Sequence, residues 1–189
     1  MEEKELVIAF KNGEEAAFET LFSLYEEKAL RTAFLLCQNR ETARDIVQES
    51  FVHCCLNIGK LRSAEAFRPW FYRILTRTAF ATMKKEKKYL PVEEFFETDT
   101  ESFADEPFER YAEKERAEIL RREILRLSDK QRAVIVLHYF NGLSVEEIAA
   151  ATGSFQGTVK SRLFFAREKL KAELSKQNHK FQGDEIHES

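Results

Sequence analysis

The chain has 189 residues, of which 33% are charged and 43% hydrophobic, and its formal net charge is −3. This length is sufficient for one large or two small folded units, and only three Pro and six Gly argue against a many-stranded sheet. The abundance of Glu, Lys, Ala, Leu and Arg predicts an all-α protein. No apolar run is long enough for a membrane span and the first ten residues are acidic, so we expect a cytoplasmic protein without membrane insertion.

The three cysteines, Cys37, Cys54 and Cys55, have neither the number nor the spacing of a disulfide framework or a zinc site. His53 stands beside two of them, but adjacent residues on a helix point about 100° apart and cannot converge on one ion. We therefore expect no metal and no cofactor. An enzyme is the least favoured class, because no constellation of His, Ser, Cys or carboxylate residues suggests catalysis.

The N-terminal part predicts a short helix over residues 4–11 and an amphipathic helix over 14–37. A third helix is expected over 42–58, with Thr42 as a possible cap. It carries an acidic and amide stripe beside its apolar face: Asp45, Gln48, Glu49 and Val52. Composition alone favours a solvated stripe, and an interface for a basic partner helix is the alternative.

The stretch 61–88, LRSAEAFRPWFYRILTRTAFATMKKEKK, predicts a basic helix. Pro69 fits the first turn of a helix, so the helix should begin near it, after a loop or turn over 57–68. Trp70 is expected in the core. The opposite side carries Arg73, Arg77, Phe80, Lys84 and Lys88. Basic groups with an interleaved ring suit single-stranded nucleic acid, and the alternative is that Phe80 is core and the lysines form a solvated helix end.

Charge is segregated along the chain. Residues 60–88 contain nine Lys or Arg and two Glu, a net charge of +7, whereas residues 91–109 contain eight acids and no base, a net charge of −8. The acidic segment shows no helical periodicity of its apolar residues, and its composition predicts a flexible linker. It also contains Phe95, Phe96, Phe103 and Phe108. These rings could dock into a partner, or the acids could fold back over the basic helices and weaken premature DNA binding.

The C-terminal part predicts two helices over 112–140, broken at LSDKQ, where Ser128 and Gln131 have capping-box spacing. The pattern of residues 143–174 then predicts a helix-turn-helix. Ser144 and Glu147 form a second capping box, and Gly153 supplies the conformation that ends the first helix. After the turn, one face of the second helix is apolar: Val159, Leu163, Ala166 and Leu170.

The remaining faces of this last helix are polar and basic. Its start carries Gln156, Thr158, Lys160, Ser161 and Arg162, and Arg167 continues the positive charge. Residues 156–176 contain six Lys or Arg and two Glu, a net charge of +4. This is the arrangement of a recognition helix in a major groove, and the alternative is a solvated amphipathic hairpin.

Four ordered motifs resemble the extracytoplasmic-function group of bacterial sigma factors: DIVQESF at 45–51, FRPWFYRIL at 67–75, LSDKQRAVIVLHYFNGLSVEEIA at 127–149 and GTVKSRLFFAREKL at 157–170. The resemblance implies two small helical domains. Residues 1–90 would be a region 2-like domain and 111–175 a region 4-like helix-turn-helix domain. They would be joined by the acidic linker 91–110 and followed by a polar tail, 176–189.

The resemblance also implies partners: core RNA polymerase, promoter DNA and an anti-sigma factor. Residues matching the polymerase-clamp motif are Asp45, Gln48, Glu49 and Phe51. Those matching the loop and helix that capture and melt the −10 element are Asn57, Lys60, Arg62, Arg73, Arg77, Phe80, Lys84 and Lys88. Those matching the −35 reading helix are Gln156, Thr158, Lys160, Ser161, Arg162 and Arg167. The implied function is promoter-directed transcription initiation in response to a stress or envelope signal.

The chain departs from the family pattern at four positions. Arg77 stands where Asn is usual and Ala81 where Asp is common, so the −10 preference should differ from that of relatives. Ser154 stands where an apolar residue is usual, and Phe155 where a small residue or Pro is usual. The resemblance therefore does not determine which DNA contacts the start of the last helix makes. Two other classes are considered: a stand-alone helix-turn-helix regulator with a helical sensory half, and an adaptor whose basic helices bind acidic protein.

Overall fold

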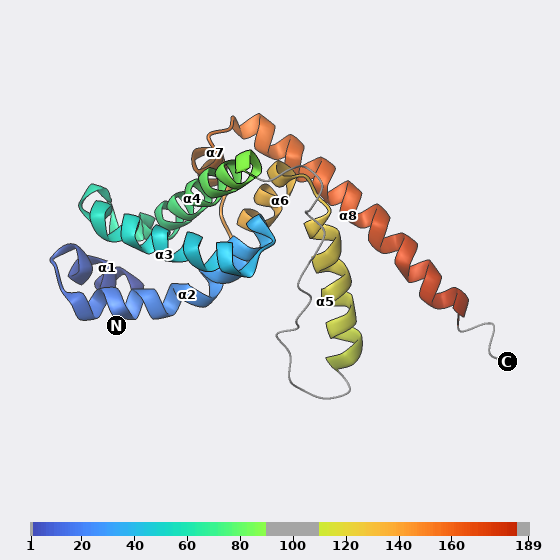
Figure 1. Cartoon of the computed structure of the whole chain (residues 1–189), viewed down its shortest axis with the longest axis horizontal. Coiled ribbons are helices and arrows are strands. Elements are labelled where there is room, and N and C mark those ends of the chain that lie inside the picture. Colours follow the sequence, from blue (N-terminus) through green and yellow to red (C-terminus); the bar gives the residue numbers. More distant parts are fainter. Residues whose placement is uncertain (1, 90–109, 185–189) are drawn as a thin grey trace.

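The computed structural model describes residues 2–89 and 110–184, and every regular element in these ranges is a helix (Figure 1). The N-terminal half contains α1 (Glu3–Lys11), α2 (Glu15–Cys37), α3 (Arg40–Asn57), the 3-10 turns η1 (Ile58–Lys60) and η2 (Ala64–Ala66), and α4 (Phe67–Tyr89). The C-terminal half contains α5 (Arg110–Leu125), α6 (Asp129–Ile135), the π-helical turn η3 (Val136–Phe140), α7 (Val145–Thr152) and α8 (Gln156–Asp184). The all-α prediction is confirmed.

Three helix ends differ from the sequence-based expectation. Helix α3 begins at Arg40 because Asn39 is its cap, and the side chain of Asn39 accepts a hydrogen bond from the Thr42 amide at 2.9 Å. Helix α4 begins two residues before Pro69, which still lies in the first turn. Helix α8 continues to Asp184 instead of ending near residue 175, because residues 175–182 contain neither Gly nor Pro. The linker residues 91–109, with their four phenylalanines, lie outside the described ranges.

Aromatic rings fill the centre of the N-terminal half, where α2, α3 and α4 meet. The ring of Phe51 lies 4.5 Å from that of Phe22 and 4.8 Å from that of Phe71, centroid to centroid. Tyr25 packs edge-on against Phe67 and Phe71. Burying each large side chain contributes about 1.5–3 kcal/mol, so these rings fix how α4 crosses the other two helices.

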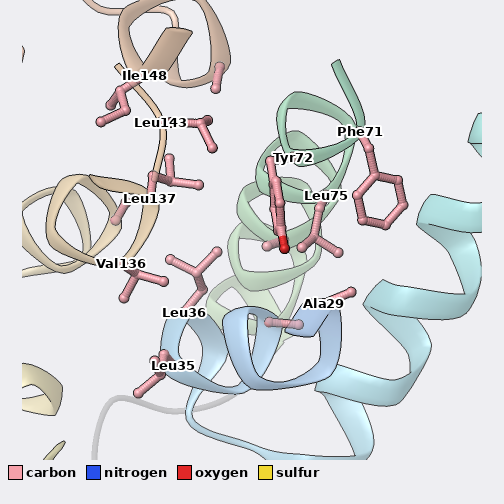
Figure 2. Packing of buried hydrophobic residues seen from close by; sticks show 14 of the residues in the cluster. Ala29, Leu35, Leu36, Phe71, Tyr72, Leu75, Val136, Leu137, Leu143 and Ile148 are labelled. Carbon is pink, nitrogen blue, oxygen red and sulfur yellow. The ribbon is translucent and has the colours of Figure 1, made fainter. Parts of the chain in front are cut away.

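The two halves share one hydrophobic core. Helix α4 packs along α7, and α2 packs against α6 and η3. Figure 2 shows Leu36 of α2 together with Tyr72 and Leu75 of α4, facing Leu137 and Leu143 of the C-terminal half. The sequence predicted two small helical domains joined by a linker and left their relative orientation open. In the structure the two halves also meet over a continuous apolar interface.

Polar groups are buried at this interface and are hydrogen-bonded across it. Arg132 is 2% exposed and donates to the carbonyl of Leu36 in α2 at 2.8 Å. Its guanidinium also donates to the carbonyls of Leu125 and Leu127, both at 3.1 Å, and to Asp129 at 2.8 Å. One cation therefore satisfies carbonyl groups from both halves of the molecule.

Further hydrogen bonds cross between the halves, among them one from the Gln38 side chain to the carbonyl of Leu125 at 3.2 Å. The Asn141 amide donates to the Thr32 hydroxyl at 2.9 Å, and both residues are buried. Arg68 of α4 donates to the carbonyl of Gly142 at 2.9 Å. Gly142 has φ +64°, a left-handed conformation that favours glycine, so glycine allows the turn that presents this carbonyl to Arg68.

We predict that Arg132→Ala lowers the free energy of unfolding by about 3 kcal/mol, because it leaves buried carbonyls of both halves without a donor. Urea unfolding followed by circular dichroism measures the loss. The control is Arg31→Ala, since Arg31 pairs with Glu27 on the exposed surface of α2 and such pairs contribute about 0–1 kcal/mol. Equal effects of the two substitutions would contradict the role given to Arg132.

Candidate nucleic-acid interface

The helix-turn-helix forms as its sequence predicts. The Ser144 hydroxyl accepts from the Glu147 amide at 3.2 Å, and the Glu147 carboxylate accepts from the Ser144 amide at 2.8 Å, which completes the capping box of α7. Gly153 ends α7 with φ +64°, the left-handed conformation expected of it. The next residue, Ser154, donates its amide to the carbonyl of Ala149 at 3.0 Å. These bonds fix the angle at which α8 leaves the turn.

Helix α8 buries one side and exposes the other. The buried side is the predicted one: Val159, Leu163, Ala166 and Leu170. The first turns of the opposite side expose Gln156, Gly157, Lys160 and Ser161, whereas Thr158 is half-buried. The Ser161 hydroxyl donates to the carbonyl of Gly157 at 3.0 Å and can still accept from a base edge. Figure 1 shows that this end of α8 lies beside α7, at the edge of the molecule.

Two arginines of α8 lie elsewhere than expected for residues that contact bases. Arg162 is half-buried and donates to the Ser154 hydroxyl at 2.8 Å, so it braces the turn. Arg167 is exposed but lines an apolar groove formed by α5, η3 and α8, on a different side from Ser161. Lys160 is therefore the basic residue on the exposed first turns of α8.

A second surface lies where α3, the loop after it and α4 surround a hollow of about 1070 Å³. Five residues predicted for the −10 element line this hollow: Asn57, Lys60, Arg62, Arg73 and Arg77. The ammonium of Lys60 donates to the Asn57 side chain at 2.7 Å, and Asn57 donates to the carbonyl of His53 at 2.9 Å. The tertiary structure thus gathers these basic and amide groups around one space.

The other members of the predicted −10 set are distributed differently. Phe80 is partly buried and packs against the hydrophobic core, which agrees with the core alternative. Lys84 is exposed but does not line the hollow. Lys88 lies in the last turn of α4, and its side chain falls outside the described part of the chain.

Residues outside the predicted −10 set also line the hollow. Trp70, predicted to be core, is partly buried and packs against the core, and it also lines the hollow one turn before Arg73. Glu147 and Ala150 of α7 also line it, because α7 packs along α4. The position of Trp70 on the helix face preceding Arg73 and Arg77 was visible in the sequence. The approach of α7 was not, because it depends on contacts between the two halves.

An ion pair braces the loop that borders the hollow. Lys4 of α1 lies 2.6 Å from Glu65, and Ser63 also donates a hydrogen bond to this carboxylate. The hydrogen bond from Lys4, followed by that from Ser63, lowers the pKa of Glu65 to about 2. The Lys11 ammonium donates to the carbonyl of Leu61 at 2.7 Å. Helix α1 therefore holds the loop at two points.

The acidic and amide stripe predicted on α3 is exposed, whereas one residue of the predicted polymerase-binding set is not. Asp45, Gln48 and Glu49 are exposed, whereas Phe51 is 4% exposed and belongs to the aromatic core. Phe51 therefore cannot present a broad surface to a partner, and it forms part of the floor of a groove of about 680 Å³ between α2 and α3. The exposed apolar residues at this groove are Val52 and Leu56, at 52% and 76%.

Two family profiles match the chain on either side of the linker. They are Sigma-70 region 2, over residues 21–89, and Sigma-70, region 4, over residues 117–170. The chain is also 31% identical over 179 residues to the ECF RNA polymerase sigma factor SigW of Bacillus subtilis, an alignment that covers 90% of this chain and 96% of SigW. The chain belongs to the extracytoplasmic-function (ECF) family of RNA polymerase sigma factors.

The predicted family and function are thereby confirmed. As a sigma factor, the protein binds core RNA polymerase and directs it to promoter DNA for transcription initiation. A further relative is the RNA polymerase sigma factor SigV of B. subtilis, 31% identical over 169 residues, with 89% of this chain and 97% of SigV covered. Sigma factors are initiation factors without an enzymatic step of their own.

Solved structures share the fold. The sigma factor RpoE of Bartonella quintana, crystallised with the anti-sigma factor NepR, gives a TM-score of 0.67 at 24% identity, covering 84% of this chain and 96% of RpoE. CnrH, solved with the cytosolic domain of CnrY, gives 0.64 at 22% identity, covering 92% of this chain and 97% of CnrH. In the described residues, no helix has the length and apolarity needed to cross a membrane.

Proposed function

We propose that this sigma factor divides promoter recognition between the hollow at α3 and α4, which holds the melted −10 strand, and the outer side of α8, which reads the −35 duplex. The observation that carries the proposal is the gathering of Lys60, Arg62, Arg73 and Arg77 around one hollow beside Trp70. Cationic groups that follow a phosphate backbone, next to a ring on which a base can stack, are what a single strand requires.

The hollow has room and chemistry for an unpaired base. Extruding a base from a duplex costs a few kcal/mol, which stacking and phosphate contacts must offset. Trp70 supplies a ring and Asn57 an amide for the Watson–Crick edge, while Arg73 and Arg77 of α4 lie about one turn apart. Lys84 is exposed further along α4 and extends the charge toward the downstream strand.

At the −35 element, Gln156, Lys160 and Ser161 make the direct contacts. A Gln amide can bond adenine at two atoms in the major groove, and Lys160 can reach a phosphate or a guanine. Arg162 holds the turn before α8 in position, since its guanidinium donates a hydrogen bond to the Ser154 hydroxyl. Thr158 and Arg167 contact the flanking backbone, because the first is half-buried and the second lies to one side of the groove-facing residues.

Core polymerase binds the exposed side of α3. Asp45, Gln48 and Glu49 supply polar contacts, and Val52 with Leu56 supply the apolar surface that a stable interface needs. Phe51 supports this face from beneath. An anti-sigma factor is the expected regulator, because RpoE and CnrH were each solved with a partner and the RpoE partner is an anti-sigma factor. The protein acts in the cytoplasm, in response to a stress or envelope signal.

Reconstitution with core polymerase tests the proposal against the stand-alone regulator. Transcripts that start at a selected promoter only when both proteins are present support the division described above. Tight binding of the isolated chain to the same duplex, without any effect of polymerase, would favour the regulator and overturn it.

We predict that Arg73→Ala reduces promoter melting by about tenfold, because it removes one phosphate contact from the hollow. Permanganate reactivity of unpaired thymines in the polymerase complex measures melting. Lys28→Ala is the matched control, since Lys28 is an exposed cation on α2 outside the hollow. Both variants should bind core polymerase as the wild type does, and equal melting by the two would remove Arg73 from the −10 surface.

Thiol labelling reports on the polymerase face. Cys55 is exposed at the groove between α2 and α3, whereas Cys37 and Cys54 are buried, and burial raises the pKa of Cys54 to about 12. We predict that Cys55 alone reacts rapidly in the native protein, and that core polymerase slows its labelling by about tenfold or more. Mass spectrometry of the peptide containing Cys55 measures the rate. Promoter DNA alone is the control, and unchanged labelling with polymerase would place its binding surface elsewhere.

A further inference from the structure

The segment entering and following the start of α8 exposes three phenylalanines. Phe155 is 87% exposed, and Phe164 and Phe165 are 53% and 62% exposed, with the rings of the latter two 5.4 Å apart and edge to face. None of the three belongs to the apolar stripe by which α8 packs on α5, α6 and α7. Large apolar side chains left in water on a binding helix indicate a contact made only with a partner.

Hydrogen bonds hold the backbone around Phe155 in place. Its carbonyl accepts from the Val159 amide at 3.1 Å, in the first turn of α8. Immediately before it, Ser154 is held at two points, by its amide bond to Ala149 at 3.0 Å and by the 2.8 Å hydrogen bond from Arg162. The backbone on both sides of Phe155 is therefore fixed while its ring projects into solvent. A ring held in this way needs little ordering when it meets a ligand.

The surroundings of Phe155 favour DNA over a protein partner. The exposed residues that follow it in the first turns of α8 are Gln156, Gly157, Lys160 and Ser161, none of which carries a large apolar side chain. Neither the groove between α2 and α3 nor the groove beside α5 and α8 includes Phe155. A single ring set among an amide, a hydroxyl and a cation matches the mixed chemistry of a major groove, where the one apolar group is the C5-methyl of thymine.

From this geometry we infer that Phe155 is a specificity-determining residue that packs on a thymine methyl group at the edge of the −35 element. The inference rests on the proposed function of α8. Gln156 follows directly and suits adenine, so the two residues together can recognise one A·T pair through its methyl group and its adenine edge. Burial of one methyl corresponds to about a fourfold gain in affinity.

The experiment begins by selecting −35 sequences from a randomised promoter library with the reconstituted polymerase holoenzyme. Each thymine of the selected element is then replaced by deoxyuridine, which keeps the hydrogen-bonding groups and lacks the methyl. The wild-type holoenzyme should lose about threefold to fivefold in affinity at one thymine. Phe155→Ala should bind the thymine and uracil forms of that site equally, and Phe155→Leu should retain part of the difference.

Two variants on the same helix serve as controls. Phe165→Ala removes a similarly exposed ring about 15 Å further along the helix axis and should keep the thymine preference at that site. Lys160→Ala should weaken binding to both forms equally and reduce the salt dependence, because it removes a charge contact. Circular dichroism confirms that each variant folds.

The outcomes separate this inference from the proposed function. Failure of the holoenzyme to select any −35 sequence overturns both. A selected element at which the wild type is indifferent to every uracil replacement, or a Phe155→Ala variant that keeps the full thymine preference, overturns the inference about Phe155 and leaves the role of α8 intact.

Discussion

The buried guanidinium of Arg132 is the interaction on which the arrangement of the two halves depends. A buried cation is costly unless it is paired and hydrogen-bonded. Here the two terminal nitrogens of the guanidinium bond to carbonyls of Leu36, Leu125 and Leu127 and to Asp129, whereas Nε is buried without a hydrogen-bond partner in the described part of the chain. Burial lowers the pKa of Arg132, and Asp129 opposes that shift. Because one of these carbonyls ends α2 and the others belong to the C-terminal half, displacing either half leaves polar groups unsatisfied.

The packing of α7 on α4 affects the two proposed DNA-binding surfaces differently. With α7 along α4, Glu147 and Ala150 border the hollow proposed for the −10 strand, so a strand that enters meets a carboxylate among the basic groups. The outer side of α8 remains exposed in the same arrangement. The packing of α7 on α4 therefore places a carboxylate beside the basic groups of the hollow and leaves the first turns of α8 exposed.

The two surfaces also differ in chemistry. The hollow combines four cationic side chains with Trp70 and suits an unstacked strand, which is bound mainly through phosphate and stacking. The start of α8 carries one exposed lysine, polar groups and exposed rings. Binding of DNA at this surface should therefore depend more on contacts with base edges than on charge. The overall net charge of −3 gives the isolated protein no general electrostatic attraction for DNA. This agrees with a protein whose DNA affinity depends on its assembly with polymerase.

Most of the local structure was predictable because it depends on local spacing. The capping box at Ser144 and Glu147, the left-handed Gly153 and the buried stripe of α8 all follow from residues a few positions apart. The predicted Ser128 cap is only partly formed, since its hydroxyl bonds the Gln131 side chain and not a backbone amide. Family motifs added the partners, which spacing alone left open.

By itself, the sequence determined that the chain is helical, where its helix-turn-helix lies, and which family it belongs to. Only the tertiary structure decided that Arg162 braces a turn, that Trp70 lines the hollow and that both halves share one core. The physical reason is that helical periodicity identifies the apolar side of each helix but not the element that packs against it. That choice depends on contacts between residues distant in the chain, such as Arg132 with Leu36 and α7 with α4.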